Sequence, residues 1–364
     1  MPFIIDAHED IAYSALTFNR NYLQSVSETR RREAGSSIPA DTGDATLGWR
    51  EYQRGQVALV IGTIYLTPKK YQSPNWPGFT YATPQEAYPL ALEQFDYYRR
   101  LADDNPHAFS LVRNRSELAK IMAPHLAPAA EKTERPVGIV LSMEGAEGIR
   151  SMDDLTEFWE RGLRLIGPVW AGMRFCGGSM EHRDFTPEGY QLLEVMASHG
   201  YVLDIAHMDE RSALTAIGRY QGTVIASHAN VRSLLKDLPG ERHLSNATIQ
   251  ELFSRDGIIG VIPFNKFLRP GWVAGEDRRL TSVDLLITHI DTLCQMAGDS
   301  LHVGIGSDFD GGFGLQDIPT EMDNISDLQI LDGLLQEKGY SPEDTQNILG
   351  ANWLRMLERN LPDA

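Results

Sequence analysis

The sequence predicts an α/β protein folded as a (β/α)8 barrel of the TIM type, with long loops on its carboxyl-terminal face. Eight short apolar runs recur along the 364 residues, and amphipathic helical patterns separate them. The runs are continuous and rich in β-branched residues, as strands buried on both faces of a parallel sheet are. Such barrels exceed the usual ~150 residues per domain, so residues 1–364 are expected to form one domain. An open, doubly wound sheet fits the same alternation and is the alternative.

Gly, Pro or polar residues bound each predicted strand. The strands are expected at residues 3–6, 57–65, 137–142, 163–170, 201–206, 223–227, 257–262 and 302–307. Between them, the pattern at 85–103 places apolar residues three and four apart. The helix predicted at 187–200 has a proline at its start and a glycine at its end, as helices prefer. Further helices are expected to begin at Ser245, Thr281 and Ser341.

Three connections are too long to be ordinary loops, namely residues 12–50, 66–84 and 263–281. Much of the first is expected to be helical. Each follows a predicted strand and therefore belongs to the carboxyl-terminal face, where barrel active sites lie. These segments are expected either to wall a pocket there or to make oligomer contacts, and both alternatives remain open.

The composition argues against several classes of partner. The chain has 50 acidic and 33 basic residues, giving a net charge of −17, which repels nucleic acid. The N-terminus lacks the features of a signal peptide, and no apolar run approaches the ~18–20 residues that span a bilayer. A cytoplasmic protein without a membrane partner is therefore expected. The two cysteines, Cys176 and Cys294, are expected to be buried thiols and not a disulfide framework.

Histidines and acids gather where the predicted strands end. They are His8 and Asp10 after the first strand, Glu144 after the third, and His207, His228 and Asp308 at the ends of the fifth, sixth and eighth. His8 and Asp10 are two residues apart in an extended segment, which points both side chains the same way. Singly, each residue is more often a satisfied polar group than a ligand. Together they deliver metal-ligating groups to one rim of the barrel.

The residue types suit a pair of divalent cations. Zinc binds imidazole nitrogens and carboxylate oxygens, although such mixed sites also accept other divalent metals. A carboxylate can bridge two ions ~3.5–4 Å apart, which leaves Asp308 free to act as a base. The remaining seven histidines have no second candidate ligand nearby and are interpreted as structural. The chain contains no P-loop, Rossmann fingerprint or nucleophile elbow.

At these positions the sequence resembles the membrane (renal) dipeptidase family of zinc peptidases, which have an amidohydrolase-like barrel. Six short motifs carry the resemblance: D-x-H-x-D at 6–10, E-G at 144–145, D-I-A-H at 204–207, S-H at 227–228, R-x-L-S at 242–245 and G-S-D-F-D-G at 306–311. The resemblance implies two Zn²⁺ ions, the first bound by His8 and Asp10 and the second by His207 and His228. It implies that Glu144 bridges them and that the protein is a homodimer. It further implies that Asp308 handles the proton and that Arg242 holds the substrate's C-terminal carboxylate.

The sequence departs from this family at the substrate pocket. Ala7 and Glu9 stand where the family usually has Gly and Asn. More importantly, Trp170 occupies the place of a substrate-contacting histidine that follows the fourth strand. A tryptophan cannot replace the hydrogen bond of an imidazolium to a carbonyl oxygen or oxyanion, and losing one such donor costs on the order of 10²–10³ in rate. We therefore expect an intact metal site and an altered substrate pocket that includes Trp170.

The expected activity is hydrolysis of the amide bond of a dipeptide or dipeptide-like small molecule that carries a carboxylate. A hydroxide bridging the two ions is expected to attack the carbonyl, while Asp308 passes the proton to the leaving amine. The first alternative is a related hydrolase that acts on an N-acyl amino acid or a lactone, because Trp170 replaces the histidine. The second is a barrel that only binds or supports other molecules, which retention of every candidate ligand disfavours.

Overall fold

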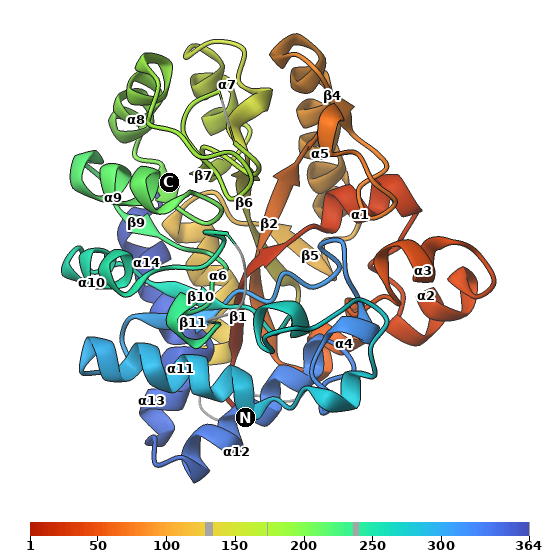
Figure 1. The fold of residues 1–364 in the computed structure, drawn as a ribbon. Helices are drawn as coiled ribbons and strands as arrows, with labels where there is room; N and C mark the ends of the chain where they lie inside the picture. The colour runs from red at the N-terminus through yellow and green to blue at the C-terminus, as the bar shows by residue number, and fades with distance from the viewer. Residues whose placement is uncertain (128–133, 173, 236–239, 364) are drawn as a thin grey trace.

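The main sheet of the protein closes into a barrel of eight parallel strands. The computed structural model describes residues 1–127, 134–172, 174–235 and 240–363. The strands follow the order β10-β11-β1-β2-β6-β7-β8-β9, and the parallel bridge between Ala226 and Ile259 joins the two ends. The Gly260 amide donates to the Ala226 carbonyl at 2.8 Å, across the same junction. The predicted barrel is therefore confirmed, and the open sheet is wrong (Figure 1).

All eight predicted strands are present. Their bounds are β1 Ile4–Glu9, β2 Val57–Tyr65, β6 Val137–Glu144, β7 Leu163–Gly167, β8 Val202–Asp204, β9 Val224–Ile225, β10 Ile259–Val261 and β11 Val303–Ile305. Three short strands were not predicted: β5 (Phe109–Leu111) adds to β6, while β3 (Thr67–Pro68) pairs with β4 (Thr80–Tyr81). Strands β3 and β4 lie within the long connection 66–84 and give it an ordered base.

Helices surround the strands, and α8 to α11 follow one another along the left side of the barrel in Figure 1. The helices that follow the predicted patterns are α5 Pro84–Asp104, α8 Pro187–His199, α10 Asn246–Ser254, α11 Asp284–Ala297 and α13 Pro342–Gln346. The others are α1 Ile11–Phe18, α2 Val26–Glu33, α3 Ile38–Thr42, α4 Trp49–Arg54, α6 Arg115–Leu126, α7 Asp154–Glu160, α9 Glu210–Arg219, α12 Ile330–Glu337 and α14 Asn352–Asn360. None of the helices in the described ranges has the length and apolar character needed to span a bilayer.

Side-chain caps explain where several helices begin. Thr186, Ser245 and Ser341 each lie just before a helix and accept a hydrogen bond from a backbone amide of its first turn. Such a cap satisfies one of the amides that the helix itself leaves without a partner. Gly200 ends α8 in the left-handed conformation, at a φ of 85°, which a glycine adopts without strain. Both cysteines are buried free thiols, as predicted.

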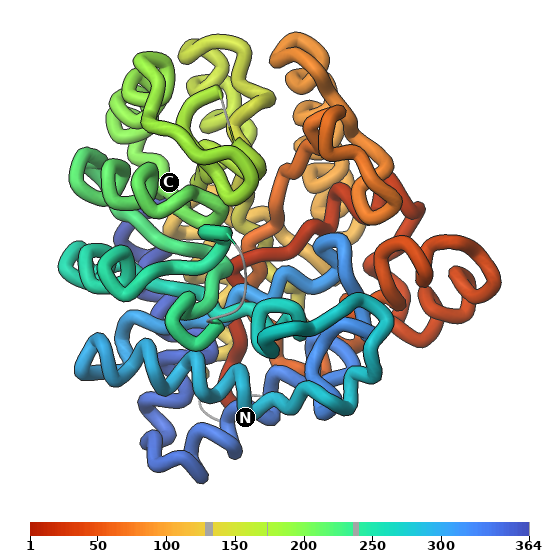
Figure 2. Tube along the Cα trace, viewed as in Figure 1, coloured from red at the N-terminus to blue at the C-terminus, as the bar shows by residue number. Residues whose placement is uncertain are grey.

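The connection 12–50 is helical, as predicted, and it packs against the segment that follows β11 (Figure 2). Asp310, which is fully buried, joins the two segments. Its carboxylate accepts hydrogen bonds from the Thr46 amide at 2.8 Å and the Tyr22 hydroxyl at 3.1 Å, and it pairs with Arg20 at 3.1 Å. These bonds hold the backbone that carries Asp308, two residues earlier.

Gly306 provides a test of how tightly the strand ends fit. A Cβ added at Gly306 would lie 1.9 Å from the Ser227 carbonyl oxygen, so the backbone next to His228 would have to shift. We expect Gly306→Ala to lower the free energy of unfolding by about 1–3 kcal/mol, as overpacking does. Gly218→Ala in α9 is the control, because an added Cβ there meets nothing within 4 Å. This change should raise stability by about 0.4–1 kcal/mol. Urea denaturation of both variants measures the difference, and equal stabilities would contradict the packing argument.

Candidate metal centre

Glu144 lies at the middle of a cluster of histidines and acids at the mouth of the barrel. It is the last residue of β6, although the sequence placed it two residues beyond that strand. Its Oε1 atom lies 2.8 Å from His207 Nε2 and 3.2 Å from His228 Nε2. Its Oε2 atom lies 3.7 Å from His8 Nε2. One oxygen of this carboxylate therefore faces two imidazoles, and the other oxygen faces a third.

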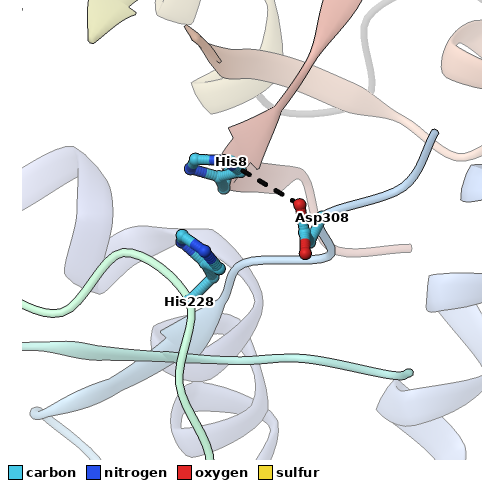
Figure 3. A group of neighbouring side chains, drawn as sticks. All are labelled: His8, His228 and Asp308. Atoms are coloured by element: carbon cyan, nitrogen blue, oxygen red, sulfur yellow. Dashed lines mark ion pairs between the residues drawn. The ribbon is translucent and has the colours of Figure 1, made fainter. Parts of the chain in front are cut away.

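His8 completes the second half of the cluster. Its Nε2 atom lies 3.9 Å from an Asp10 oxygen and 3.8 Å from an Asp308 oxygen. Figure 3 shows His8, His228 and Asp308 converging from β1, the loop after β9 and the loop after β11. The structure thus brings together all six residues that the sequence selected from the strand ends.

His8 and Asp10 meet for a different reason from the one the sequence suggested. Strand β1 ends at Glu9, and its register with β2 shifts between Asp6 and Glu9. Asp10 lies beyond the strand, where it precedes α1 with a φ of −88° and a ψ of 45°. An irregular strand end followed directly by a helix, and not a continuous extended segment, therefore directs both side chains to the site.

Two similar hydrogen-bonded ties position the strand ends. Asp6 accepts hydrogen bonds from the amide of Ser307, at 2.7 Å, and from its hydroxyl. In the same way, Asp204 accepts hydrogen bonds from the amide of Ser227, at 2.9 Å, and from its hydroxyl. Each serine directly precedes a residue of the cluster, and each aspartate lies two or three residues before one of its histidines. The ties therefore lock neighbouring strand ends together in pairs.

Two residues of the cluster adopt unusual backbone conformations. His207 has a φ of 67° and Asp308 a φ of 58°, in the left-handed region that residues with side chains seldom occupy. Such strain costs about 1–3 kcal/mol per residue and persists where the surrounding structure imposes it. The conformation turns both side chains toward Glu144 and His8 immediately after short strands.

The cluster fits a pair of cations. Three sets of ligand atoms lie within 4.8 Å of one another: His8 with Asp10 and Glu144; Glu144 with His207 and His228; and His8 with His228 and Asp308. The Nε2 atoms of His207 and His228 are 3.0 Å apart, as expected of two imidazoles that converge on one point. His8 Nε2 and Asp10 Oδ1 are buried without a hydrogen-bond partner, although buried polar atoms are normally satisfied. Cations at these points would satisfy them.

The electrostatics of the cluster match this interpretation. Burial and Arg242 lower the pKa of His207 to about 4, and burial lowers the pKa of His228 well below its usual value. Both imidazoles are therefore neutral, which is the form that binds metal. Burial opposes a charge on His8, but Glu144, Asp10 and Asp308 outweigh it and raise its pKa to about 10. Burial also raises the pKa of Asp308 well above its usual value. The acids around His8 thus favour the binding of a positive charge next to its ring.

Arg242 lies beside the cluster, and two of its three guanidinium nitrogens have no hydrogen-bond partner within the described part of the chain. Its Nη1 atom donates to the His228 carbonyl oxygen at 3.1 Å, while Nε and Nη2 are buried without partners. Burial lowers its pKa, and Asp308 and Glu144 oppose that effect. Arginine nevertheless keeps its charge in proteins. Two unpartnered donors on one guanidinium have the geometry to bind a carboxylate.

Trp170 follows β7 and lies next to the metal cluster, as the sequence indicated. Its ring centre is 6.1 Å from that of His207. Ser179 connects the two residues, because its hydroxyl donates to the Trp170 carbonyl at 3.3 Å and lies 3.5 Å from His207 Nδ1. A tryptophan at this point presents an apolar surface and cannot supply an imidazole.

Sequence reasoning missed several polar residues that orient the histidines. Ser227 Oγ lies 2.8 Å from His228 Nδ1, and Thr63 Oγ1 lies 3.4 Å from His8 Nδ1. Partners on the second ring nitrogen set the tautomer and direction of a metal-binding imidazole. The serine could have been found, because the chain has Ser immediately before both His228 and Asp308. Thr63 could not, because it lies within an otherwise apolar strand.

An eight-stranded barrel that collects imidazoles and carboxylates at the carboxyl ends of its strands has the architecture of metal-dependent hydrolases. The family model described as membrane dipeptidase (peptidase family M19) matches residues 2–361. The chain therefore belongs to the membrane dipeptidase family and is a metal-dependent hydrolase.

Three related proteins illustrate the extent of the similarity. An uncharacterized protein from the pqqA 5′ region of Klebsiella pneumoniae is 28% identical over 62% of this chain and 83% of its own length. An uncharacterized dipeptidase of Schizosaccharomyces pombe is 24% identical over 98% of this chain and 80% of its own. A metallopeptidase from Rhodobacter sphaeroides, solved with a phosphinate mimic of the dipeptide L-Ala-D-Ala, superposes with a TM-score of 0.77. That structure is 22% identical and covers 99% of both chains, which supports the fold alone.

Replacing the central carboxylate should empty the metal site. We expect Glu144→Gln to lose bound metal, because an amide has one neutral oxygen in place of two charged ones and cannot face both groups of ligands. Metal-affinity losses of more than 10–100-fold are expected, since even outer partners of ligands contribute that much. Elemental analysis of the purified variant after dialysis measures the metal-to-protein ratio. Glu157→Gln, on α7, is the control and should retain the wild-type ratio; an unchanged ratio in Glu144→Gln would contradict the bridging position.

Proposed function

We propose that the protein is a binuclear zinc hydrolase that cleaves the amide bond of dipeptides or dipeptide-like molecules with a free carboxylate. The observation that carries this proposal is the carboxylate of Glu144, whose two oxygens face His8 on one side and His207 and His228 on the other. In this assignment His8 and Asp10 hold one ion, His207 and His228 hold the other, and Glu144 is shared. Membership of the membrane dipeptidase family supports the same reaction.

The metal pair, when bound, supplies a water of lowered pKa and polarises the substrate's carbonyl group. Asp308 passes the proton that this water loses to the leaving amine. Its carboxylate lies 3.8 Å from His8 Nε2, and burial keeps its pKa well above the usual value. An acid with a raised pKa can hold a proton at neutral pH and release it to a departing amine. Its left-handed backbone directs this carboxyl group into the cluster.

Arg242 orients the substrate. The unpartnered Nε and Nη2 atoms form one edge of a guanidinium, and this geometry matches the two oxygens of a carboxylate. A substrate bound there by its C-terminal carboxylate would extend over the metal cluster. Before a substrate binds, Asp308 and Glu144 favour the charge of Arg242 beside the two uncharged imidazoles.

Trp170 supports a second candidate function within the same reaction class. Its ring stands where the family resemblance places a substrate-contacting histidine, and it lies 6.1 Å from His207. The altered pocket favours a related amidohydrolase whose substrate is an N-acyl amino acid or a lactone. Dipeptides and N-acyl amino acids with the same C-terminal residue, tested side by side, distinguish the two candidates.

Asp308 should be essential for turnover but not for holding metal. We expect Asp308→Asn to lower kcat by at least about 10²–10⁴, the range for a group that transfers a proton in the rate-limiting step. The metal content should stay at the wild-type value, because the amide still fills the same space beside His8. Steady-state kinetics and elemental analysis on one preparation provide both readings. Activity near the wild-type level would show that Asp308 has another role.

Arg242 should matter only for substrates that carry the carboxylate. We expect Arg242→Lys to lower kcat/KM about 10²–10³-fold for a dipeptide, because a single ammonium cannot form the paired contact. The C-terminally amidated form of the same dipeptide serves as the control substrate. Wild type and variant should differ by less than about fivefold on it. An equal loss on both substrates would place Arg242 outside the carboxylate site.

A further inference from the structure

Four aromatic side chains form one wall of the barrel mouth that the proposed reaction does not use. We call Tyr65, Tyr71, Trp76 and Trp170 the aromatic wall. Trp170 is its centre: the ring centres of Trp76, Tyr65 and Tyr71 lie 5.1, 5.2 and 6.1 Å from it. The interplanar angles are 75°, 66° and 75°, so the rings meet edge to face and form corners instead of a flat stack.

The wall adjoins the metal cluster. Tyr65 pairs with Glu144 in the register of β2 and β6, and residues directly opposite on neighbouring strands share a face of the sheet. Tyr65 therefore projects into the mouth beside Glu144. Its hydroxyl is buried and has no hydrogen-bond partner among the described residues. Burial raises the pKa of this hydroxyl, and the nearby Thr67 side chain opposes that effect. Trp170 continues the wall to His207.

The part of the wall that follows β2 lies across the barrel from β9, the strand that precedes Arg242. The strands follow the cyclic order β10-β11-β1-β2-β6-β7-β8-β9, which places β2 diametrically opposite β9. Arg242 belongs to the segment after β9, whereas Tyr65 ends β2 and Trp76 lies in the segment after it. A molecule whose carboxylate is bound by Arg242 and whose amide lies at the metal cluster can therefore extend its other end toward Tyr65 and Trp76, while Trp170, which follows β7, lies beside the cluster at His207.

Contacts with the rest of the mouth hold the wall in place. Asn75 Nδ2 donates to the Gly312 carbonyl at 2.8 Å, and the Trp76 indole rests against Gly312, where an added Cβ would lie 2.7 Å from its Nε1 atom. On the other side, Lys70 and Tyr71 both bind the Glu181 carboxylate. The connection 66–84 is thus tied to the segment after β11 and to the segment after β7.

We propose that Trp76 and Trp170 are specificity-determining residues that select a bulky apolar group at the end of the substrate opposite its carboxylate. This inference rests on the proposed hydrolysis and adds the substrate class. The rings offer edges and faces to an apolar side chain, and an aromatic group fits the edge-to-face corners that they form. A methyl side chain would leave most of the wall in contact with water and gain little of this binding energy.

The experiment compares dipeptides that share their C-terminal residue. For zinc-loaded wild type we expect kcat/KM for Phe-Ala to exceed that for Ala-Ala by about 10–100-fold, the range for burying one large apolar side chain. Trp76→Ala should reduce this ratio to less than about threefold. Trp272→Ala is the matched control: Trp272 lies in the long connection 263–281, and its indole bonds to Asp317 and not to the wall. This control should keep the wild-type ratio.

A binding measurement gives a reading that does not depend on turnover. Phosphinate pseudodipeptides with a benzyl or a methyl group at the position facing the wall are titrated calorimetrically into the zinc-loaded proteins. The benzyl compound should bind wild type about 10–100-fold more tightly, and Trp76→Ala should remove the difference. Hydrolysis of both dipeptides with equal kcat/KM, or equal binding of the phosphinates, would overturn the specificity role alone. Failure to hydrolyse any dipeptide would overturn the proposed function, and the inference with it.

Discussion

The shared carboxylate of Glu144 joins two groups of ligands into one centre. It lies beside the buried carboxylate of Asp10 and that of Asp308, whose side chain is 14% exposed, and placing like charges side by side away from water is costly unless positive charge lies between them. His207 and His228 do not provide this charge, because burial keeps them neutral, and His8, whose pKa is raised to about 10, provides one positive charge for three carboxylates. A divalent cation would provide it, and the ligand atoms within each group of the cluster lie within 4.8 Å of one another, close enough to hold one. The fold therefore creates an electrostatic demand that metal binding satisfies.

The rest of the barrel keeps that arrangement from relaxing. Asp6 with Ser307, and Asp204 with Ser227, tie the ends of adjacent strands just before residues of the cluster. Without such ties, repulsion among the acids could move the short strand ends apart. Asp310 performs a similar task farther from the centre, because it anchors the helices of residues 12–50 to the backbone that follows Asp308. Buried polar groups satisfied in this way rigidify the structure around them.

Much of this architecture was predictable because it depends on local sequence. Continuous β-branched runs revealed all eight barrel strands, and the ends of those strands revealed the six residues of the cluster. What escaped prediction depends on contacts between distant residues. The register shift in β1, the left-handed conformations of His207 and Asp308, and the pairing of β3 with β4 have no local pattern. The aromatic wall escaped for the same reason, because Trp76 and Trp170 come from segments almost a hundred residues apart and meet only in the folded mouth.

The wall also bears on the histidine that the family resemblance places at the position of Trp170. A hydrogen-bond donor aimed at the reacting oxygen stabilises the transition state directly, and an indole beside His207 cannot do the same through an apolar surface. An enzyme can compensate with binding energy from a remote part of the substrate, which holds the reacting bond in position over the catalytic groups. Arg242 at one side of the mouth and the wall at the other would grip a substrate at both ends. In the proposed reaction the amide would be held between them, so the metal cluster and Asp308 would act on a bond whose position is already set, and the apolar replacement would change which substrates react and not the chemistry itself.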